Sequence, residues 1–387
     1  MQRQIGIRRH GRAARGSLAV LGLALTMGTA ACDTEEAKVE GDATTFRAGS
    51  TPNFALRVGD MARAADAAYY DGDADHQELA IRGPGGSTMV HRHRWDLSAK
   101  KIQVYEYVSD DGKNYSLIVS FRGTRPTSWD DIRADLTGLV SKAVNPANPW
   151  RPGTTIQGEV GKGFNRRVVE YMEGVNASAS EGRVLHTTDH LEYPGCTGVS
   201  GGEALRCYVE HVMNLDGTKI DVHVVGHSLG GIASQLFSIY LGRFMRAQAY
   251  DASRYRVFNF AFNSPKGGDC VFVNEFATNV NDGVFVPFNF TMEHDPVSTW
   301  NLTVKWLGLI DQPNDTEPFM RGHPVGYCPH AQLPPVVPQD SIQNHALDDQ
   351  IIGSWETLLG TNSVPLLHDV ATCMKAAYEP LTLEIGG

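Results

Sequence analysis

The sequence contains no apolar stretch long enough to cross a bilayer as a helix. Its apolar run near the start, LAVLGLALTMG, has 11 residues, whereas a spanning helix needs about 20. The sequence also has no internal repeats, no P-loop, and no dinucleotide-binding glycine pattern at a strand-to-helix turn. Such glycine-rich turns are the ones that hold the phosphate groups of nucleotides.

Metal-binding patterns are scarce as well. The acidic run DGDADHQE starts like a calcium loop with Asp71, Asp73 and Asp75, but histidine and arginine stand at its sixth and twelfth places. An EF-hand needs glycine and glutamate there, so a solvated acidic loop is the better interpretation. His91 and His93 share one face of an extended segment without a cysteine or a third histidine nearby, which disfavours zinc. We expect neither a metal nor a cofactor.

Positive charge is concentrated at the start of the chain. The first 31 residues carry five arginines and no acidic residue. They combine this basic start with the short apolar run and small residues before a cleavage point, which is typical of a secretory signal peptide. Without them the formal net charge changes from −10 to −15. Such an acidic chain is a poor partner for nucleic acids.

The segment around Cys32 suggests how the exported chain is held. The small residues before Cys32 resemble a bacterial lipobox, whose cysteine is lipidated after cleavage, although Thr29 stands where leucine is usual. Residues 32–51 are polar and acidic, as expected of a disordered tether. We therefore expect residues 1–31 to be removed, leaving a lipoprotein of the bacterial cell envelope that this lipid anchors to a membrane. Secretion after cleavage at Ala31 is the alternative.

Export also permits disulfides among the remaining cysteines. Cys196 and Cys207 are the predicted pair, because both lie in one glycine-rich insertion at 174–215. Five cysteines make an odd number, so one thiol can stay free and the other pairing is left open. The remaining three are Cys270, Cys328 and Cys373.

Hydrophobic patterning indicates an α/β fold. An alternating segment at 101–124 turns at Asp-Asp-Gly and predicts a hairpin. A buried strand at 220–225 leads into an amphipathic helix at 231–248. Helices are also predicted at 54–70, 163–175 and 203–214, strands at 255–265 and 283–292, and a closing helix at 345–359. This alternation favours a mostly parallel central sheet flanked by helices, here in one domain at 52–387.

Gly-x-Ser-x-Gly, the pattern of a serine-hydrolase nucleophile, occurs twice. Around Ser228 it follows the buried strand and precedes the amphipathic helix, as a nucleophile elbow requires. Gly226 and Gly230 stand two residues before and after this serine, where side chains would collide in so tight a turn. Ser200 instead follows EYPGCT, whose proline and glycine interrupt any strand. The context favours Ser228 as a nucleophile over a serine in a structural turn.

A serine hydroxyl needs a base, and a further group that orients the base. In this type of elbow the acid and then the histidine follow the serine along the chain. Asp295 directly follows a predicted strand, although an ordinary Asp-Pro turn is the alternative. His323 and His330 lie in a loop rich in proline, whereas His345 opens the closing helix and His368 lies near the end. These residues leave more than one histidine open as the base.

Five motifs carry a resemblance to one family of known proteins. The elbow motif is VVGHSLGGIASQL, and SFRGTRPTSWDDIRADL is similar to an oxyanion strand followed by a lid segment. The other three are VGKGFNRRV, FNFAFNSPKGGD and EHDPVSTW. All five stand in the right order over roughly residues 54–360. In this order they resemble the fungal-type class 3 lipases.

The resemblance implies an α/β-hydrolase fold and assigns roles to individual residues. Ser228 would be the nucleophile, Asp295 the acid and His345 the base. The backbone N–H groups of Thr124 and Leu229 would form the oxyanion hole. The chain departs from the family in its longer insertion, and in HALDDQ, where an aromatic residue is common. The histidines at 330 and 368 therefore stay open as alternative bases.

The family resemblance also implies a substrate class. We expect a serine carboxylic-ester hydrolase of triacylglycerol lipase or esterase type, acting on lipid esters at an interface through an acyl-enzyme. A phospholipase A or a phenolic-ester esterase of feruloyl type would use the same triad. The alternative without catalysis is a lipid-binding lipoprotein.

Thr127–Leu136 is interpreted as the lid over this site. Trp129, Ile132 and Leu136 share one apolar helical face, while the acidic residues lie elsewhere. Such a face can cover the site in water and turn toward lipid at an interface, although simple core packing is the alternative.

For a short triglyceride, we expect the hydrolysis rate to jump as its concentration passes the solubility limit, because a lipid surface draws the lid away. Trp129→Ser should reduce that jump, since it removes the largest side chain of the apolar face. Rate measured against substrate concentration checks this expectation. A smooth hyperbola for both proteins would contradict the lid.

Overall fold

The computed structural model describes residues 51–69, 89–97, 102–123, 142–173, 201–265, 267–268, 270–292 and 331–333, with positions 295, 297, 345 and 352. Among these residues, no helix is long and apolar enough to cross a membrane. The same residues contain no cluster of histidine, cysteine, aspartate and glutamate side chains that could hold a metal ion. The signal segment, Cys32, the acidic run DGDADHQE and the lid lie outside the described residues and remain predictions.

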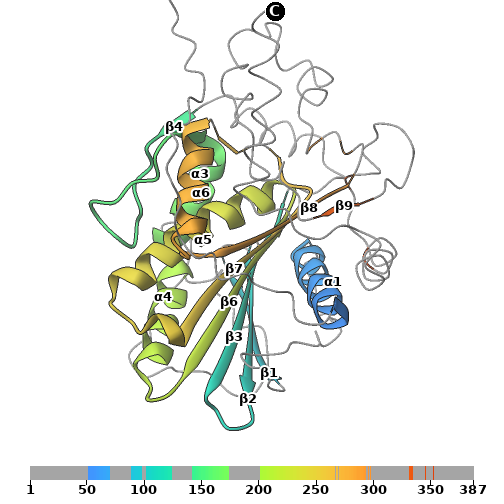
Figure 1. Ribbon diagram of the computed structural model, residues 1–387, viewed down its shortest axis with the longest axis vertical. Helices are drawn as coiled ribbons and strands as arrows, with labels where there is room; N and C mark the ends of the chain where they lie inside the picture. Colours follow the sequence, from blue (N-terminus) through green and yellow to red (C-terminus); the bar gives the residue numbers. More distant parts are fainter. Residues whose placement is uncertain are drawn as a thin grey trace, which may run out of the picture. The chain divides into compact units, whose positions relative to one another are not determined.

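A seven-stranded sheet forms the centre of the protein (Figure 1). In spatial order its strands are β1 (Met89–Leu97), β2 (Ile102–Ser109), β3 (Asn114–Phe121), β6 (Lys219–His227), β7 (Tyr255–Phe262), β8 (Val286–Met292) and β9 (Ala331–Leu333). The first three are antiparallel, and every neighbouring pair from β3 to β9 is parallel. The predicted α/β class with a mostly parallel sheet is therefore confirmed. A small second sheet pairs β4 (Lys142–Val144) with β5 (Glu159–Gly161).

Helices cover both faces of the central sheet (Figure 1). The helix α1 (Thr51–Ala67) lies on one face, and the other face carries α3 (Lys162–Glu173), α4 (Gly201–Asn214), α5 (Leu229–Ala247) and α6 (Cys270–Asn281). A short 3₁₀ helix, η2 (Ala252–Arg254), precedes β7. Because both faces are covered, the central strands are apolar on both sides, as parallel strands in α/β proteins are.

The alternation of side chains along β3 shows how the two cores divide. Leu117, Val119 and Phe121 belong to the core under α3, α4, α5 and α6, whereas Ile118 belongs to the core under α1. Successive side chains of a strand point to opposite faces, so one short strand serves both cores. Burying each such side chain contributes about 1.5–3 kcal/mol to the free energy of unfolding.

Most predicted elements appear at the expected places. The hairpin of β2 and β3 turns at Gly112, which has a φ of +66°. The first helix begins at Thr51 and ends at Ala67, three residues before its predicted end, because Tyr69 belongs to a turn closed by a hydrogen bond to the Asp66 carbonyl. The three-residue strand β9 was not predicted, because it is too short to show a period.

The junction of β6 and α5 is packed against the end of β3 without room for side chains. A Cβ atom on Gly226 would overlap the Gly230 carbonyl, and one on Gly230 would overlap the Phe121 carbonyl. These neighbours are backbone atoms, which cannot turn aside as the tip of a flexible side chain can. Glycine is therefore required here for close approach, as the sequence predicted.

Gly226→Ala should destabilise the protein by about 1–3 kcal/mol or more, because the added methyl group forces backbone atoms apart. Gly112→Ala is the matched control, since its positive φ disfavours alanine but nothing lies within 4 Å of the added Cβ. Urea unfolding of both variants measures the two free energies. A cost for Gly226→Ala no greater than that for Gly112→Ala would show that the junction is looser than described.

Candidate active site

Ser228 stands between the end of β6 and the start of α5. Its backbone has φ 58° and ψ −130°, a conformation that residues other than glycine rarely adopt and that costs about 1–3 kcal/mol. Its N–H donates to the Phe262 carbonyl at 3.0 Å, which ties this strained residue to the end of β7. Leu229 follows as the first residue of the helix. The positive end of the helix dipole therefore lies beside the serine.

Asp295 and His345 form a buried pair. His345 Nδ1 lies 3.0 Å from Asp295 Oδ1 and 3.1 Å from Oδ2. The aspartate is fully buried and His345 is 7% exposed. Asp295 Oδ1 also accepts a hydrogen bond from the Val297 backbone N–H at 2.9 Å. Because a buried carboxylate is costly without partners, these contacts fix its position as well as that of the imidazole.

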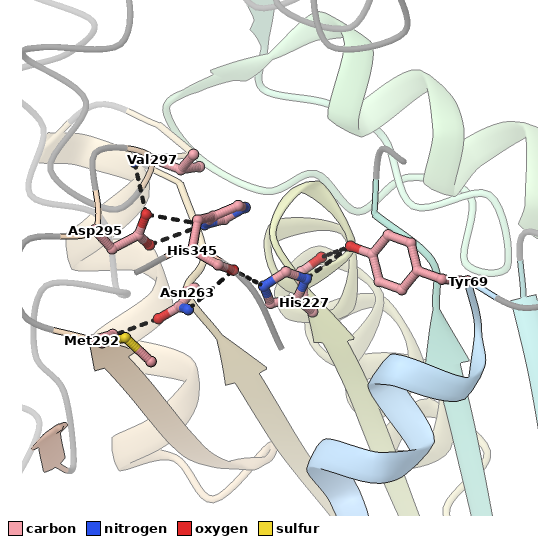
Figure 2. A network of polar contacts seen from close by, with 7 residues as sticks. All are labelled: Tyr69, His227, Asn263, Met292, Asp295, Val297 and His345. Carbon is pink, nitrogen blue, oxygen red and sulfur yellow. Dashed lines mark hydrogen bonds and ion pairs between the residues drawn. The ribbon is translucent and has the colours of Figure 1, made fainter. Parts of the chain in front are cut away.

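The elbow and the Asp295–His345 pair lie side by side (Figure 2). The ring of His345 is 4.8 Å from the ring of His227, measured between centroids, and His227 directly precedes Ser228. Asp295 comes three residues after Met292, the last residue of β8, and its N–H donates to the Met292 carbonyl at 3.3 Å. Neighbouring parallel strands thus bring their carboxyl ends to one edge of the sheet, as in other α/β proteins.

His227 is a residue that sequence reasoning did not single out. Its Nδ1 lies 2.8 Å from the Tyr69 hydroxyl, and its Nε2 lies 2.7 Å from the His345 carbonyl oxygen (Figure 2). Burial, together with the nearby His345, lowers the pKa of His227 well below its usual value. The ring is therefore neutral at physiological pH. The available signal was a histidine inside the elbow pattern itself, directly before Ser228.

Asn263 is a second residue that the sequence did not reveal. Its Nδ2 donates to the His345 carbonyl at 3.4 Å, and its Oδ1 accepts from the Met292 N–H at 2.8 Å. It directly follows β7 and has a φ of +46°, a left-handed conformation that asparagine tolerates better than most residues. Asn263 therefore links the end of β8 to the backbone of His345.

The structure describes one of the two predicted oxyanion donors, Leu229, and also Gly123, which directly precedes the other. A Cβ atom on Gly123 would come within 3.1 Å of the Ser228 Cβ, so the chain after β3 runs beside the elbow. Thr124 itself lies outside the described residues, as do the lid residues Trp129, Ile132 and Leu136, and the histidines at 323, 330 and 368. Cys207 on α4 is disulfide-bonded, but its predicted partner Cys196 lies outside the described residues too.

Solved structures of lipases are similar to this chain. The chain is 17% identical to a lipase of Rhizomucor miehei in a propeptide complex, with a TM-score of 0.39 over 66% of this chain and 65% of that one. It is also 17% identical to lipase II from Rhizopus niveus, with a TM-score of 0.38 over 66% and 77% of the two chains. The chain thus spans less than two thirds of the Rhizomucor miehei chain. No curated protein matches it.

A family sequence model also matches part of the chain. The model described as Lipase (class 3) matches residues 118–304. This range contains the second half of β3, the elbow with Ser228, and Asp295, and it ends before His345. Over residues 118–304, the chain is therefore similar to the class 3 lipases.

Proposed function

We propose that this protein is a lipase-type carboxylic-ester hydrolase, with Ser228 as nucleophile, His345 as general base and Asp295 as the acid that orients the base. The observation that carries the proposal is the buried Asp295–His345 pair beside the elbow. Both carboxylate oxygens lie within 3.1 Å of the imidazole Nδ1. The class 3 lipase match over the elbow and Asp295 supports the same assignment.

In the proposed acylation step, His345 Nε2 takes the Ser228 hydroxyl proton while Oγ attacks the ester carbonyl carbon. Asp295 accepts the hydrogen bond from His345 Nδ1–H, so Nε2 is the nitrogen with the free lone pair, and the imidazolium that forms is stabilised. The tetrahedral intermediate then collapses, and the leaving alkoxide oxygen takes the proton from Nε2 and departs as the alcohol. An ester between the acyl group and Ser228 remains.

In the proposed deacylation step, water takes the place of the serine hydroxyl. His345 Nε2 accepts a proton from this water as its oxygen attacks the acyl carbonyl carbon. The second tetrahedral intermediate collapses, Ser228 Oγ leaves with the proton from Nε2, and the carboxylic acid is released. The same residues thus serve both halves of the reaction.

The negative charge on the tetrahedral intermediate needs donors in place. Leu229 is the first residue of α5, and the first N–H groups of a helix have no partner within the helix. The Thr124 N–H is the proposed second donor, because Thr124 follows Gly123, which packs against the elbow. Losing one such donor typically costs about 10²–10³ in rate.

Lipid esters are the proposed substrates. The match of residues 118–304 to the class 3 lipases supports this choice, and the apolar face predicted at Trp129, Ile132 and Leu136 offers a surface that would turn toward lipid. The formal net charge of −10 favours neutral over anionic lipid surfaces. Export and a lipid anchor on Cys32 belong to the same proposal, since they would hold the enzyme beside its substrate.

Ser228→Ala should lower the hydrolysis of p-nitrophenyl esters, from butyrate to palmitate, by at least about 10⁴-fold, because the nucleophile is removed. A fluorophosphonate probe should label the wild type and not this variant. Ser238→Ala is the matched control: this serine is buried on the same helix, where its hydroxyl donates to the Ser234 carbonyl, and activity should persist. Undiminished labelling of Ser228→Ala, or labelling moved to Ser200, would refute the assignment.

His345→Ala should lower ester hydrolysis by several orders of magnitude, because the proposed acceptor of the serine proton is removed. His330→Ala and His368→Ala should keep most of the activity, since the contact with Asp295 belongs to His345. The measurement is kcat for all three variants, with thermal melts to verify folding. A comparable loss in His330→Ala with an intact fold would transfer the role of base to that residue.

A further inference from the structure

Tyr69 and His227 lie beside the proposed triad, although neither transfers a proton in the reaction described above. Tyr69 follows α1, and His227 is the last residue of β6 (Figure 2). The Tyr69 hydroxyl lies 2.8 Å from His227 Nδ1 and 3.4 Å from the His227 carbonyl oxygen. One hydroxyl therefore contacts both the ring and the backbone of the residue that precedes Ser228.

The carbonyl oxygen of His345 determines which group donates in each hydrogen bond of His227. The His345 carbonyl oxygen can only accept, so His227 Nε2, 2.7 Å away, carries the proton. Because burial keeps the His227 ring neutral, Nδ1 has a free lone pair, and the Tyr69 hydroxyl donates to it. The donors thus run in one direction, from Tyr69 through His227 to the backbone of His345.

The other side of the Tyr69 oxygen faces the chain that leaves β3. Burial raises the pKa of the Tyr69 phenol well above its usual value, and a hydrogen bond from the Gly123 backbone acts in the opposite sense. A side chain on Gly123 would overlap the Tyr69 hydroxyl and come within 2.5 Å of the His227 carbonyl oxygen. Since Gly123 directly precedes Thr124, Tyr69 joins the proposed oxyanion segment to the elbow.

We propose that Tyr69 and His227 are positioning residues, which set the direction of the His345 imidazole through its own backbone carbonyl. Asn263 Nδ2 donates to the same oxygen at 3.4 Å, so two donors restrain the rotation of this peptide group. Asp295 holds the ring from the other end, at Nδ1. The proposal rests on the proposed function, because the direction of the ring matters only if His345 is the base.

This arrangement explains why a neutral histidine stands next to the nucleophile. During catalysis His345 becomes positively charged, and a second charge on the adjacent ring 4.8 Å away would oppose that step. A neutral His227 avoids this repulsion and still donates from Nε2. Small displacements of a reacting group reduce rates steeply, by as much as about 100-fold for 1 Å.

Tyr69→Phe and His227→Leu should each lower kcat about tenfold, because a neutral hydrogen bond is lost, with KM within about twofold of the wild type. His227→Gln should retain more kcat than His227→Leu, since its amide can still donate to the His345 carbonyl. Each kcat is expressed per active site, with sites counted by a phosphonate that releases one p-nitrophenol for each serine modified. This count distinguishes a lower turnover at each active site from a smaller number of intact active sites.

Two buried residues away from the elbow provide matched controls. Tyr171 is fully buried, and its hydroxyl has no hydrogen-bond partner in the part of the chain that the structure describes. His223 lies four residues before His227 on the same strand. Tyr171→Phe and His223→Gln should therefore leave kcat per site unchanged. The double variant Tyr69→Phe/His227→Leu should lose no more than His227→Leu alone, because both changes break one chain of contacts.

Four outcomes are distinguishable. Lower kcat per titrated site in Tyr69→Phe and His227→Leu, with partial recovery in His227→Gln, supports positioning. Fewer titratable sites with wild-type kcat per site would overturn the proposal, because it would show that the two residues only stabilise the fold. Additive losses in the double variant would also overturn it. A wild-type protein that is not modified at Ser228 would instead refute the proposed function.

Discussion

Everything at the site depends on the close approach of three backbone segments, where the end of β3, the end of β6 and the start of α5 meet. Gly123, Gly226 and Gly230 make this possible, because a Cβ atom at any of them would overlap neighbouring atoms. The chain must reverse direction within this space, which forces Ser228 to a φ of 58°. The strain is therefore a consequence of packing, and the sheet and helix on either side maintain it.

The same junction determines where the proposed base lies. His345 is far from the elbow in sequence, and it is held there by its backbone carbonyl, which accepts from His227 and Asn263. Its side chain is held by Asp295, a fully buried carboxylate that follows β8. A buried carboxylate without partners would be costly, so the charge of Asp295 and the orientation of the imidazole depend on each other.

The parts of this structure that could be predicted from the sequence are local ones. The buried strand, the glycine spacing and the helical period around Ser228 all lie within 220–248, so one short window contains the elbow. The contacts of His227 could not be predicted, because its partners are distant in the chain. Tyr69 is separated from it by 158 positions and His345 by 118 positions. No period or spacing carries such information. The position of Asp295 could be predicted from its strand, whereas the choice of His345 needed the family resemblance.

The central claim is that Ser228, His345 and Asp295 act as one unit, with Leu229 beside the developing charge. A crystal structure of the protein after reaction with a phosphonate ester tests it most directly, because the adduct resembles the tetrahedral intermediate. The account predicts a covalent bond to Ser228 Oγ, a phosphonyl oxygen within hydrogen-bond distance of the Leu229 N–H, and His345 Nε2 near the Ser228 oxygen. An adduct on another residue, or His345 turned away from Ser228 while still paired with Asp295, would contradict it.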